Sequence, residues 1–184
     1  MTIQYTTALP LEGLIEITPR CFSDSRGFFL ESYKESTFVE LGITQPFVQD
    51  NHSLSHRGVL RGIHFQRGDM AQGKLVRVVT GSVWDVAVDL RKGSPTFMRW
   101  YGTTLSAKNQ KQLYIPRGFG HGFLTLEDET NLLYKCDNLY DQPSEAGIVF
   151  NDPLLEIKWP YLEGCEYILS DKDQALPLFK EVTL

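Results

Sequence analysis

The sequence lacks the features of a membrane protein, a secreted disulfide protein or a nucleic-acid binder. No apolar run approaches the roughly 18 residues of a membrane span, and no basic segment followed by an apolar core opens the chain as a secretory signal would. The three cysteines are an odd number without a CxxC pair, which predicts free thiols in a reducing cytosol. The formal net charge of -5 argues against nucleic acid, whose binders present extended basic surfaces. A cytoplasmic protein with a small-molecule ligand is therefore expected.

The 184 residues suffice for one domain, residues 1–184, with a buried core, and no repeat, low-complexity tract or linker divides them. Many short strand-like runs between turn residues predict an antiparallel β-sandwich or barrel. In the run 82–90, Trp84, Val86 and Val88 share one face while Val83 and its alternate neighbours share the other. The expected strands are residues 13–18, 28–33, 47–51, 58–66, 74–80, 82–90, 98–105, 112–115, 122–126, 131–137 and 148–150.

Helix signals are few. Residues 36–41 predict a short helix with Ser36 as its cap and Gly42 as its stop. Near the C-terminus, residues 170–173 resemble a helix-start box and predict one more short helix. The expected fold is thus all-β with a few short peripheral helices.

The segment 49–74 is locally basic although the whole chain is acidic. It contains His52, His56 and His64, and five Arg or Lys residues lie between positions 57 and 77 with only one acid among them. Its apolar residues predict a strand, not a solvated tail. A strand that carries Arg, His and Lys together predicts an anion pocket with a titratable group beside it. His52 and His56 are expected to be surface or structural residues.

His64 is either a structural histidine, as most lone strand histidines are, or a general base, which an imidazole with a pKa of about 6.5 can be at neutral pH. A metal site is the third possibility. His121, in PRGFGHGF, fits the second cupin metal motif, but the first motif requires H-x-H, and Gln66 stands at its second histidine. Two histidines without a third ligand make a poor zinc or iron site, so no metal is expected. His121 is then either a buried strand-end histidine or a substrate contact.

Four further side chains have both a structural and a chemical interpretation. Lys74 is a solvated strand terminus or a cation that stabilises an oxyanion. Tyr134 is a core residue or a general acid, and Tyr140 is its rival for that role. Asp173 caps the terminal helix or reaches across the domain to orient His64, and sequence spacing alone leaves both open.

Arg61 and His64 are three residues apart, so in a regular strand their side chains point to opposite faces. If both line one pocket, the strand must be irregular between them. Gly62 is the expected position of a β-bulge.

With these residues described, the chain resembles the dTDP-4-dehydrorhamnose 3,5-epimerase family, which consists of cupin-type jelly-roll enzymes. The resemblance covers nearly the whole length and is specific because many long motifs occur in order. The matching stretches are FSDSRGFFLESY, FVQDNHSLS, GVLRGIHFQ, QGKLVRVVTGSVWDVAVDLRKGSPTF, LYIPRGFGHGF, LLYK and LSDKD. The resemblance implies a cupin-like antiparallel jelly-roll barrel and a homodimer with strands shared between subunits.

The resemblance also implies roles for individual residues. His64 would be the base, Tyr134 the opposing acid, Asp173 the partner of His64, and Lys74 the cation that steadies the enolate. No cofactor is implied, because the reaction has no redox step and no Gly-rich dinucleotide fingerprint is present. The implied substrate contacts are Arg26, Glu31, Gln49, Asp50, Asn51, Arg61, His121, Glu145 and Lys172, with Arg26 and Glu31 serving the partner's pocket.

The family pattern usually reads PEGFAHGF where this chain has Arg117 and Gly120. Arg117 is expected to add positive charge near the pocket, and Gly120 to remove a methyl group beside His121. The main expectation is an epimerase acting at C3 and C5 of a dTDP-linked 4-keto-6-deoxyhexose. The alternatives are a C3-only or C5-only epimerase on a related nucleotide sugar and a non-catalytic nucleotide-sugar-binding cupin.

Overall fold

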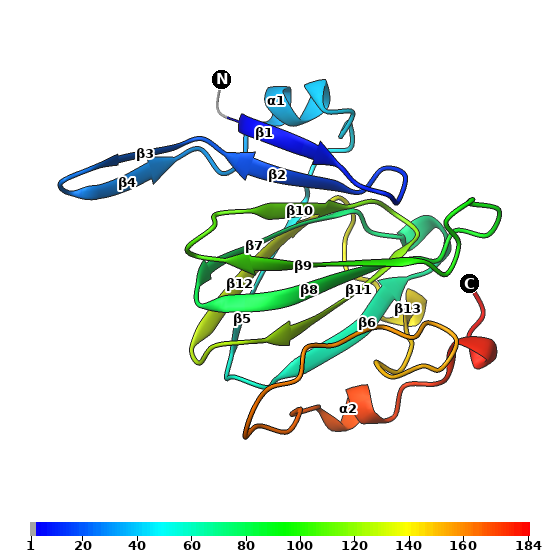
Figure 1. Cartoon of the computed structure of the whole chain (residues 1–184). Helices are drawn as coiled ribbons and strands as arrows, with labels where there is room; N and C mark the ends of the chain where they lie inside the picture. The colour runs from blue at the N-terminus through cyan, green and yellow to red at the C-terminus, as the bar shows by residue number, and fades with distance from the viewer. Residues whose placement is uncertain (1–2) are drawn as a thin grey trace.

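A computed structural model describes residues 3–184, which form two antiparallel sheets facing one another and a separate two-stranded hairpin (Figure 1). The six-stranded sheet has the order β1 (Ile3–Ala8), β2 (Ile15–Pro19), β10 (Gln112–Ile115), β7 (Lys74–Thr80), β12 (Thr130–Cys136), β5 (Gln49–Ser55). The five-stranded sheet has the order β13 (Glu145–Gly147), β6 (Leu60–Gln66), β11 (Phe119–Thr125), β8 (Ser82–Asp89), β9 (Trp100–Ser106). The hairpin consists of β3 (Cys21–Asp24) and β4 (Gly27–Leu30).

The helices are short and lie outside the sheets (Figure 1). They are α1 (Glu35–Glu40), α2 (Asp171–Gln174) and the 3-10 turns η1 (Gly68–Met70), η2 (Gln142–Ser144) and η3 (Phe179–Glu181). The predicted all-β, cupin-like fold with a few short helices is confirmed. Within residues 3–184, every helix falls short of the length and apolar content that crossing a lipid bilayer requires.

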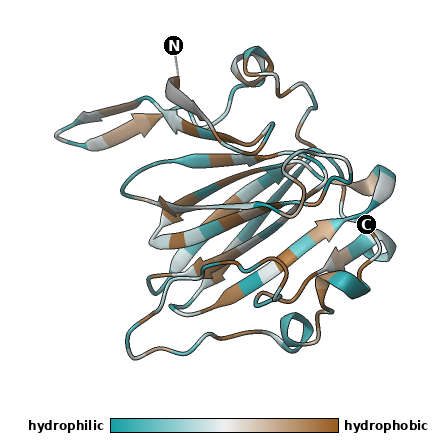
Figure 2. Ribbon diagram, turned by 45° about the vertical axis from the view of Figure 1, so that its right-hand side comes forward, coloured by the Kyte–Doolittle hydropathy of each residue, from teal (hydrophilic) through white to brown (hydrophobic). Residues whose placement is uncertain are grey.

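The main core lies between the two sheets because side chains alternate along each strand. Figure 2 shows hydrophobic and hydrophilic residues following one another along the strands. On β8, Val83 and Ala87 are fully buried against Val76 and Leu132 of the opposite sheet. The other face of β8, with Trp84, belongs to a second cluster outside the barrel. The two faces predicted for residues 82–90 are therefore confirmed.

The chain after β13 returns across the outside of the five-stranded sheet, where Leu155 and Ile157 pack against it (Figure 1). Backbone hydrogen bonds join this return to the start of β6: Ile168 N–H donates to Gly58 O at 2.8 Å, and Leu60 N–H donates to Ile168 O at 2.9 Å. The return thus places α2 directly beside the strand that carries His64.

Several sequence expectations differ from the structure. The strand expected at 148–150 is wrong; the strand is Glu145–Gly147, and residues 148–150 lie outside it as Ile148 enters the outer core. The cap of α1 is Lys34, not Ser36, whereas the predicted stop at Gly42 is confirmed by its φ of 85°. Strands β1 and β3 were not expected, because both are short and polar in part.

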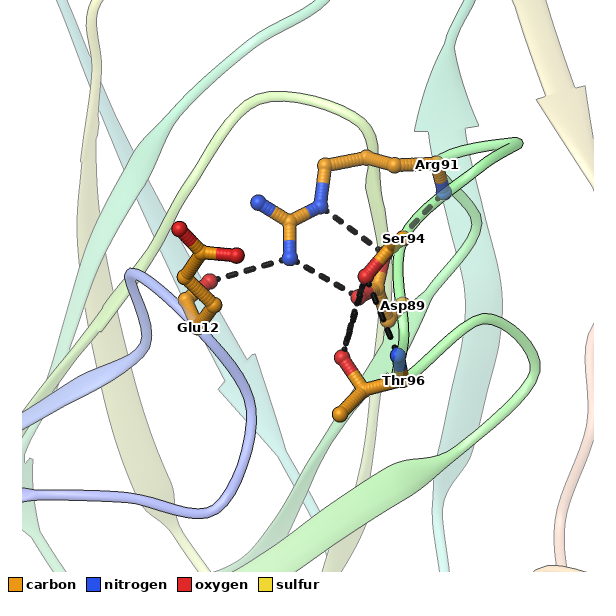
Figure 3. Close-up of polar contacts among 5 residues, drawn as sticks. All are labelled: Glu12, Asp89, Arg91, Ser94 and Thr96. Atoms are coloured by element: carbon orange, nitrogen blue, oxygen red, sulfur yellow. Dashed lines mark hydrogen bonds and ion pairs between the residues drawn. The ribbon is translucent and has the colours of Figure 1, made fainter.

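Asp89, at the end of β8, is the centre of a closed polar network (Figure 3). Its carboxylate accepts hydrogen bonds from Arg91 Nε at 2.9 Å, Ser94 Oγ at 2.6 Å and Thr96 Oγ1 at 2.6 Å, and it is 0% exposed. Arg91 Nη2 donates in turn to Glu12 O at 3.0 Å. Burial alone would raise the pKa of Asp89, but these donors outweigh it and hold the pKa well below its usual range. The network ties two loops together across one end of the barrel.

We expect Asp89→Asn to lower the free energy of unfolding by about 3 kcal/mol at pH 7, because it leaves a partly buried Arg91 without its carboxylate. Since the pKa of Asp89 is depressed, its contribution is present above the unfolded-state pKa of about 4 and is lost as the pH falls below it. Urea unfolding at pH 7 and pH 3 measures both effects, with the exposed Asp128→Asn as the control. An equal loss at the two pH values would contradict the electrostatic explanation.

Candidate active site

His64 of β6 and Asp173 of α2 contact each other although they lie 109 residues apart in the sequence. His64 Nε2 lies 2.7 Å from Asp173 Oδ1, and that oxygen also accepts from Gly62 N–H at 3.1 Å. Ser170 Oγ donates to Asp173 Oδ2 at 2.6 Å and accepts from Asp173 N–H at 3.1 Å as the N-cap of α2. The two interpretations of Asp173 are thus both found, because one carboxylate belongs to the first turn of α2 and also holds the imidazole.

The Asp173 carboxylate is ionised at neutral pH. Burial alone would raise its pKa, but the hydrogen bonds from His64, Ser170 and Gly62 N–H lower it to about 2. An ionised carboxylate only accepts, so the neutral His64 ring carries its proton on Nε2 and its lone pair on Nδ1. Nδ1 is buried and has no hydrogen-bond partner among residues 3–184. The lone pair of a histidine held in this way is free to accept a proton from a ligand.

A β-bulge brings Arg61 and His64 to the same face of β6. In the pairing with β11, His64 faces His121 and Arg61 faces Phe123, so three steps on β6 correspond to two on β11. The φ of Gly62 is 108°, and a Cβ on it would lie 2.6 Å from His121 O, so the bulge requires glycine. The irregularity predicted at Gly62 is confirmed.

His121 forms a second imidazole–carboxylate pair beside the first. Its Nε2 lies 2.9 Å from Asp85 Oδ2, and the two residues are 6% and 0% exposed. The His121 ring also makes an edge contact with the ring of Tyr134, with 6.4 Å between centroids. The sequence did not identify Asp85 as a site residue; the signal was an acid on the inward-facing side of an otherwise apolar strand.

Lys74 and Tyr134 reach the same interior from the opposite, six-stranded sheet. Tyr134 packs against the core between the sheets, and Lys74 Nζ lies 5.7 Å from the centre of its ring. Burial lowers the pKa of Lys74, although the charges of Cys136, Asp85 and Glu145 act the other way. Burial also raises the pKa of Tyr134. The interior therefore holds a protonated phenol and a desolvated amine across from the two histidines.

His64, Glu145 and Lys172 help to line a cleft of about 610 Å³. Glu145, Lys172 and Tyr140 are joined by hydrogen bonds, and this group is called the cleft rim. Glu145 accepts from Lys172 Nζ at 2.6 Å and from the Tyr140 hydroxyl at 2.9 Å. Tyr140 is 54% exposed. Of the two rival tyrosines, the structure thus places Tyr134 in the interior and Tyr140 at the rim.

On β5, the side chains divide between the two faces of the sheet. Asn51 stands opposite Tyr134 in the pairing with β12, so it faces the interior, and its Nδ2 donates to Cys136 Sγ at 3.5 Å. Gln49 also faces inward and donates to Asn51 Oδ1 at 3.1 Å. Asp50 points the other way and pairs with Lys135 on the outer face at 2.9 Å. The structure therefore does not bring Asp50 into the pocket.

Arg26 lies outside the pocket of its own chain. It sits at the turn of the hairpin β3–β4, which projects away from the barrel in Figure 1, and its side chain is 88% exposed and pairs with Asp24. Glu31 follows β4, and its Oε1 is buried without a hydrogen-bond partner among residues 3–184. Neither residue joins the group around His64 within one chain.

Arg117 and Gly120 do not alter the pocket as expected from the sequence. The charge of Arg117 is matched by Asp137, whose Oδ2 lies 3.0 Å from Arg117 Nε. Gly120 faces outward, and a Cβ there would collide with Ile63 on the far side of β11 from His121. Glycine is therefore explained by close packing between strands, not by space for a ligand.

The residues at the cupin metal position do not fit a metal. Gln66 uses its amide for hydrogen bonds to the backbone, and the Nε2 atoms of His64 and His121 face carboxylates. Among the described residues, no three His, Cys, Asp or Glu side chains come together as a ligand set. A metal ion would have to displace the hydrogen bonds of Gln66, His64 and His121, so no step of the chemistry is assigned to a metal.

Comparison with known proteins identifies the relatives of this chain. A family model described as dTDP-4-dehydrorhamnose 3,5-epimerase matches residues 8–181. The chain belongs to the dTDP-4-dehydrorhamnose 3,5-epimerase family. The dTDP-4-dehydrorhamnose 3,5-epimerase of Salmonella typhimurium is 52% identical over 185 residues, which are 100% of this chain and 99% of the relative.

Solved structures of the family have the same fold. The dTDP-6-deoxy-D-glucose-3,5-epimerase of Legionella pneumophila, in complex with dTDP-4-keto-L-rhamnose, matches with a TM-score of 0.93 and 46% identity over 97% of this chain and 94% of that one. A 3′-monoepimerase of Streptomyces bikiniensis in complex with dTDP-quinovose has a TM-score of 0.86 and 37% identity over 92% and 85%. Double and single epimerases thus share this fold.

Proposed function

We propose that the protein is an epimerase that inverts C3 and C5 of dTDP-4-dehydro-6-deoxy-D-glucose to give dTDP-4-dehydro-L-rhamnose, the precursor of dTDP-L-rhamnose. The observation that carries this is the His64–Asp173 pair, which leaves a buried lone pair on Nδ1 inside the barrel. The high identity to double epimerases supports this substrate and outcome.

The reaction needs a base, an acid and a stabilised oxyanion. The C4 carbonyl acidifies the C–H bonds at C3 and C5, and His64 removes one of these protons to give an enolate. Lys74, which reaches the interior beside Tyr134, stabilises the enolate oxygen. Tyr134 then delivers a proton to the opposite face and inverts the carbon. Each inversion removes one proton and returns one, so neither oxidant nor nicotinamide is required.

Substrate binding uses cations near the base and polar groups around them. Arg61 shares the inner face with His64, and Lys172 lies on α2 next to Asp173; these positions support the proposal that both cations bind the diphosphate. Lys172 pairs with Glu145 in the free protein and would exchange this partner for phosphate. Gln49, Asn51, His121 and Glu145 complete the proposed set of contacts.

We also propose a homodimer in which Arg26 and Glu31 serve the partner's pocket. The hairpin β3–β4 exposes Phe28 and Phe29 at 60% and 68%, an arrangement typical of an interface. Strand β5 is an edge of the six-stranded sheet and has hydrogen-bonding groups to offer a second chain. Light scattering should give twice the 21.0 kDa of one chain, and a monomer at micromolar concentration would refute the shared pocket.

The remaining proposals concern organisation and location. We propose that residues 1–184 act as one jelly-roll domain, since strands from both halves of the chain contribute to both sheets. We propose a cytoplasmic location because Cys21, Cys136 and Cys165 are free thiols.

Turnover in deuterated water tests the function. The product should carry deuterium at both C3 and C5, as NMR of the purified product shows. Label at C3 alone would identify a single epimerase, as in the 37% identical Streptomyces relative, and would refute the double inversion. Binding of dTDP without exchange of any substrate C–H would indicate a non-catalytic sugar-binding protein.

A further inference from the structure

Gln66, two residues after His64, occupies the position where a metal-binding cupin would have its second histidine. It faces inward opposite Glu145 and is 6% exposed. Its Nε2 donates to Met70 O at 2.6 Å and to Leu139 O at 3.0 Å, and its Oε1 accepts from Asp141 N–H at 2.7 Å. Both donor hydrogens and the acceptor oxygen are thus used on backbone groups.

Two other glutamines hold the same stretch of backbone. Gln49 Oε1 on β5 accepts from Tyr140 N–H at 2.8 Å. Gln72 Nε2, just before β7, donates to Asn138 O at 2.8 Å. Residues 138–141 have no strand or helix partner of their own, so side chains supply the hydrogen bonds that a ladder would otherwise supply. Gln66 is the only one of the three that bonds this stretch at two residues, Leu139 and Asp141.

The anchored stretch carries a side chain of the cleft rim. The Tyr140 side chain extends from this backbone and is exposed to solvent. Its hydroxyl donates to Glu145, which also accepts from Lys172. Glu145 in turn stands opposite Gln66 in the pairing of β13 with β6. A displacement of residues 138–141 would therefore move Tyr140 and free Glu145, whereas the hydrogen bonds between His64 and Asp173 involve none of these residues.

We propose that Gln66 is a positioning residue that fixes residues 138–141 and thereby holds the Tyr140 hydroxyl against Glu145, which lines the cleft. The neutral amide suits this role because it supplies two donors and one acceptor at one buried point. A carboxylate would supply acceptors alone, and an apolar side chain would leave three backbone groups unpaired. The proposal rests on the proposed nucleotide-sugar substrate.

The first test is hydrogen–deuterium exchange of the free protein. In Gln66→Met, which keeps the size but not the hydrogen bonds, the amide of Asp141 loses its acceptor and should exchange at least about tenfold faster than in the wild type, the change expected for loss of one hydrogen bond. Gln66→Glu keeps the acceptor and should retain more protection at Asp141 than Gln66→Met does. Gln110→Met, which removes an amide bonded to Ala107 O in a distant loop, should leave the exchange of the Asp141 amide unchanged.

The second test is steady-state kinetics with the dTDP-4-keto sugar. Gln66→Met should raise KM about tenfold while kcat stays within about threefold, because the interior groups are unaffected. Unchanged exchange and KM would overturn the proposal, as would a fall in kcat with KM unchanged. If Gln66→Met does not fold, Gln66→Glu carries the same two measurements. If the wild type fails to turn over this substrate, the proposed function fails, and the exchange measurement still decides whether Gln66 is the anchor.

Discussion

His64→Ala should lower kcat by about 10⁴-fold, the upper end of what a general base contributes. The variant removes the proposed acceptor of the C3 and C5 protons and leaves Asp173 and the cleft rim in place. Exchange of substrate C–H for deuterium should therefore disappear together with product formation. Binding of dTDP, followed by calorimetry, should change far less than kcat.

The matched control is His56→Ala. His56 is 74% exposed and lies near Asp128 at the surface, so its removal tests for nonspecific loss. Proton NMR in deuterated water measures exchange in both variants. If substrate C–H exchange continued at the wild-type rate in His64→Ala, another residue would have to be the base.

Tyr134→Phe should lower product formation by about 10² to 10³-fold while leaving exchange of substrate C–H largely intact. His64 still forms the enolate, but without the opposing phenol the proton returns from the same face, and the carbon keeps its configuration. Because burial raises the pKa of Tyr134, its phenol stays protonated at neutral pH and is ready to donate. Exchange without inversion is a specific signature of a lost acid.

Tyr140→Phe is the comparison that separates the two tyrosines. Its hydroxyl bonds Glu145 at the rim, so its loss should act mainly on KM. Product stereochemistry by NMR decides between them. Loss of inversion in Tyr140→Phe together with normal inversion in Tyr134→Phe would reverse the proposed assignment.

Local patterns in the sequence predicted most of the strands. The alternation in residues 82–90 follows from the pleat, and it assigned Val83 and Trp84 to opposite faces as the structure does. The same approach failed at 148–150, where an apolar run indicated a strand. Ile148 exchanges two backbone hydrogen bonds with Ile63 of β6 at 2.9 Å, but the strand is the more polar stretch before it and ends at Gly147. The side chain of Ile148 is apolar because it is buried in the outer core, and a short apolar run does not show where a strand begins or ends.

The site was less predictable because its contacts are long-range. The bulge at Gly62 followed from a local argument about spacing, but the contact between His64 and Asp173 depends on how the C-terminal return crosses the sheet. Arg117 was also misjudged from local sequence. It was expected to add positive charge near the pocket, whereas its charge is matched by Asp137, which lies 20 residues away in the sequence. Sequence shows which charges exist and does not show which of them neutralise each other.

The position of Asp173 on α2 also determines when its carboxylate becomes available during translation. During translation, every strand from β1 to β13 leaves the ribosome before the helix that supplies the carboxylate to His64. The emerging chain can therefore complete both sheets and still lack the group that orients the imidazole. If Asp173 has its proposed role, a chain that stops before α2 can form both sheets but lacks the carboxylate that holds His64.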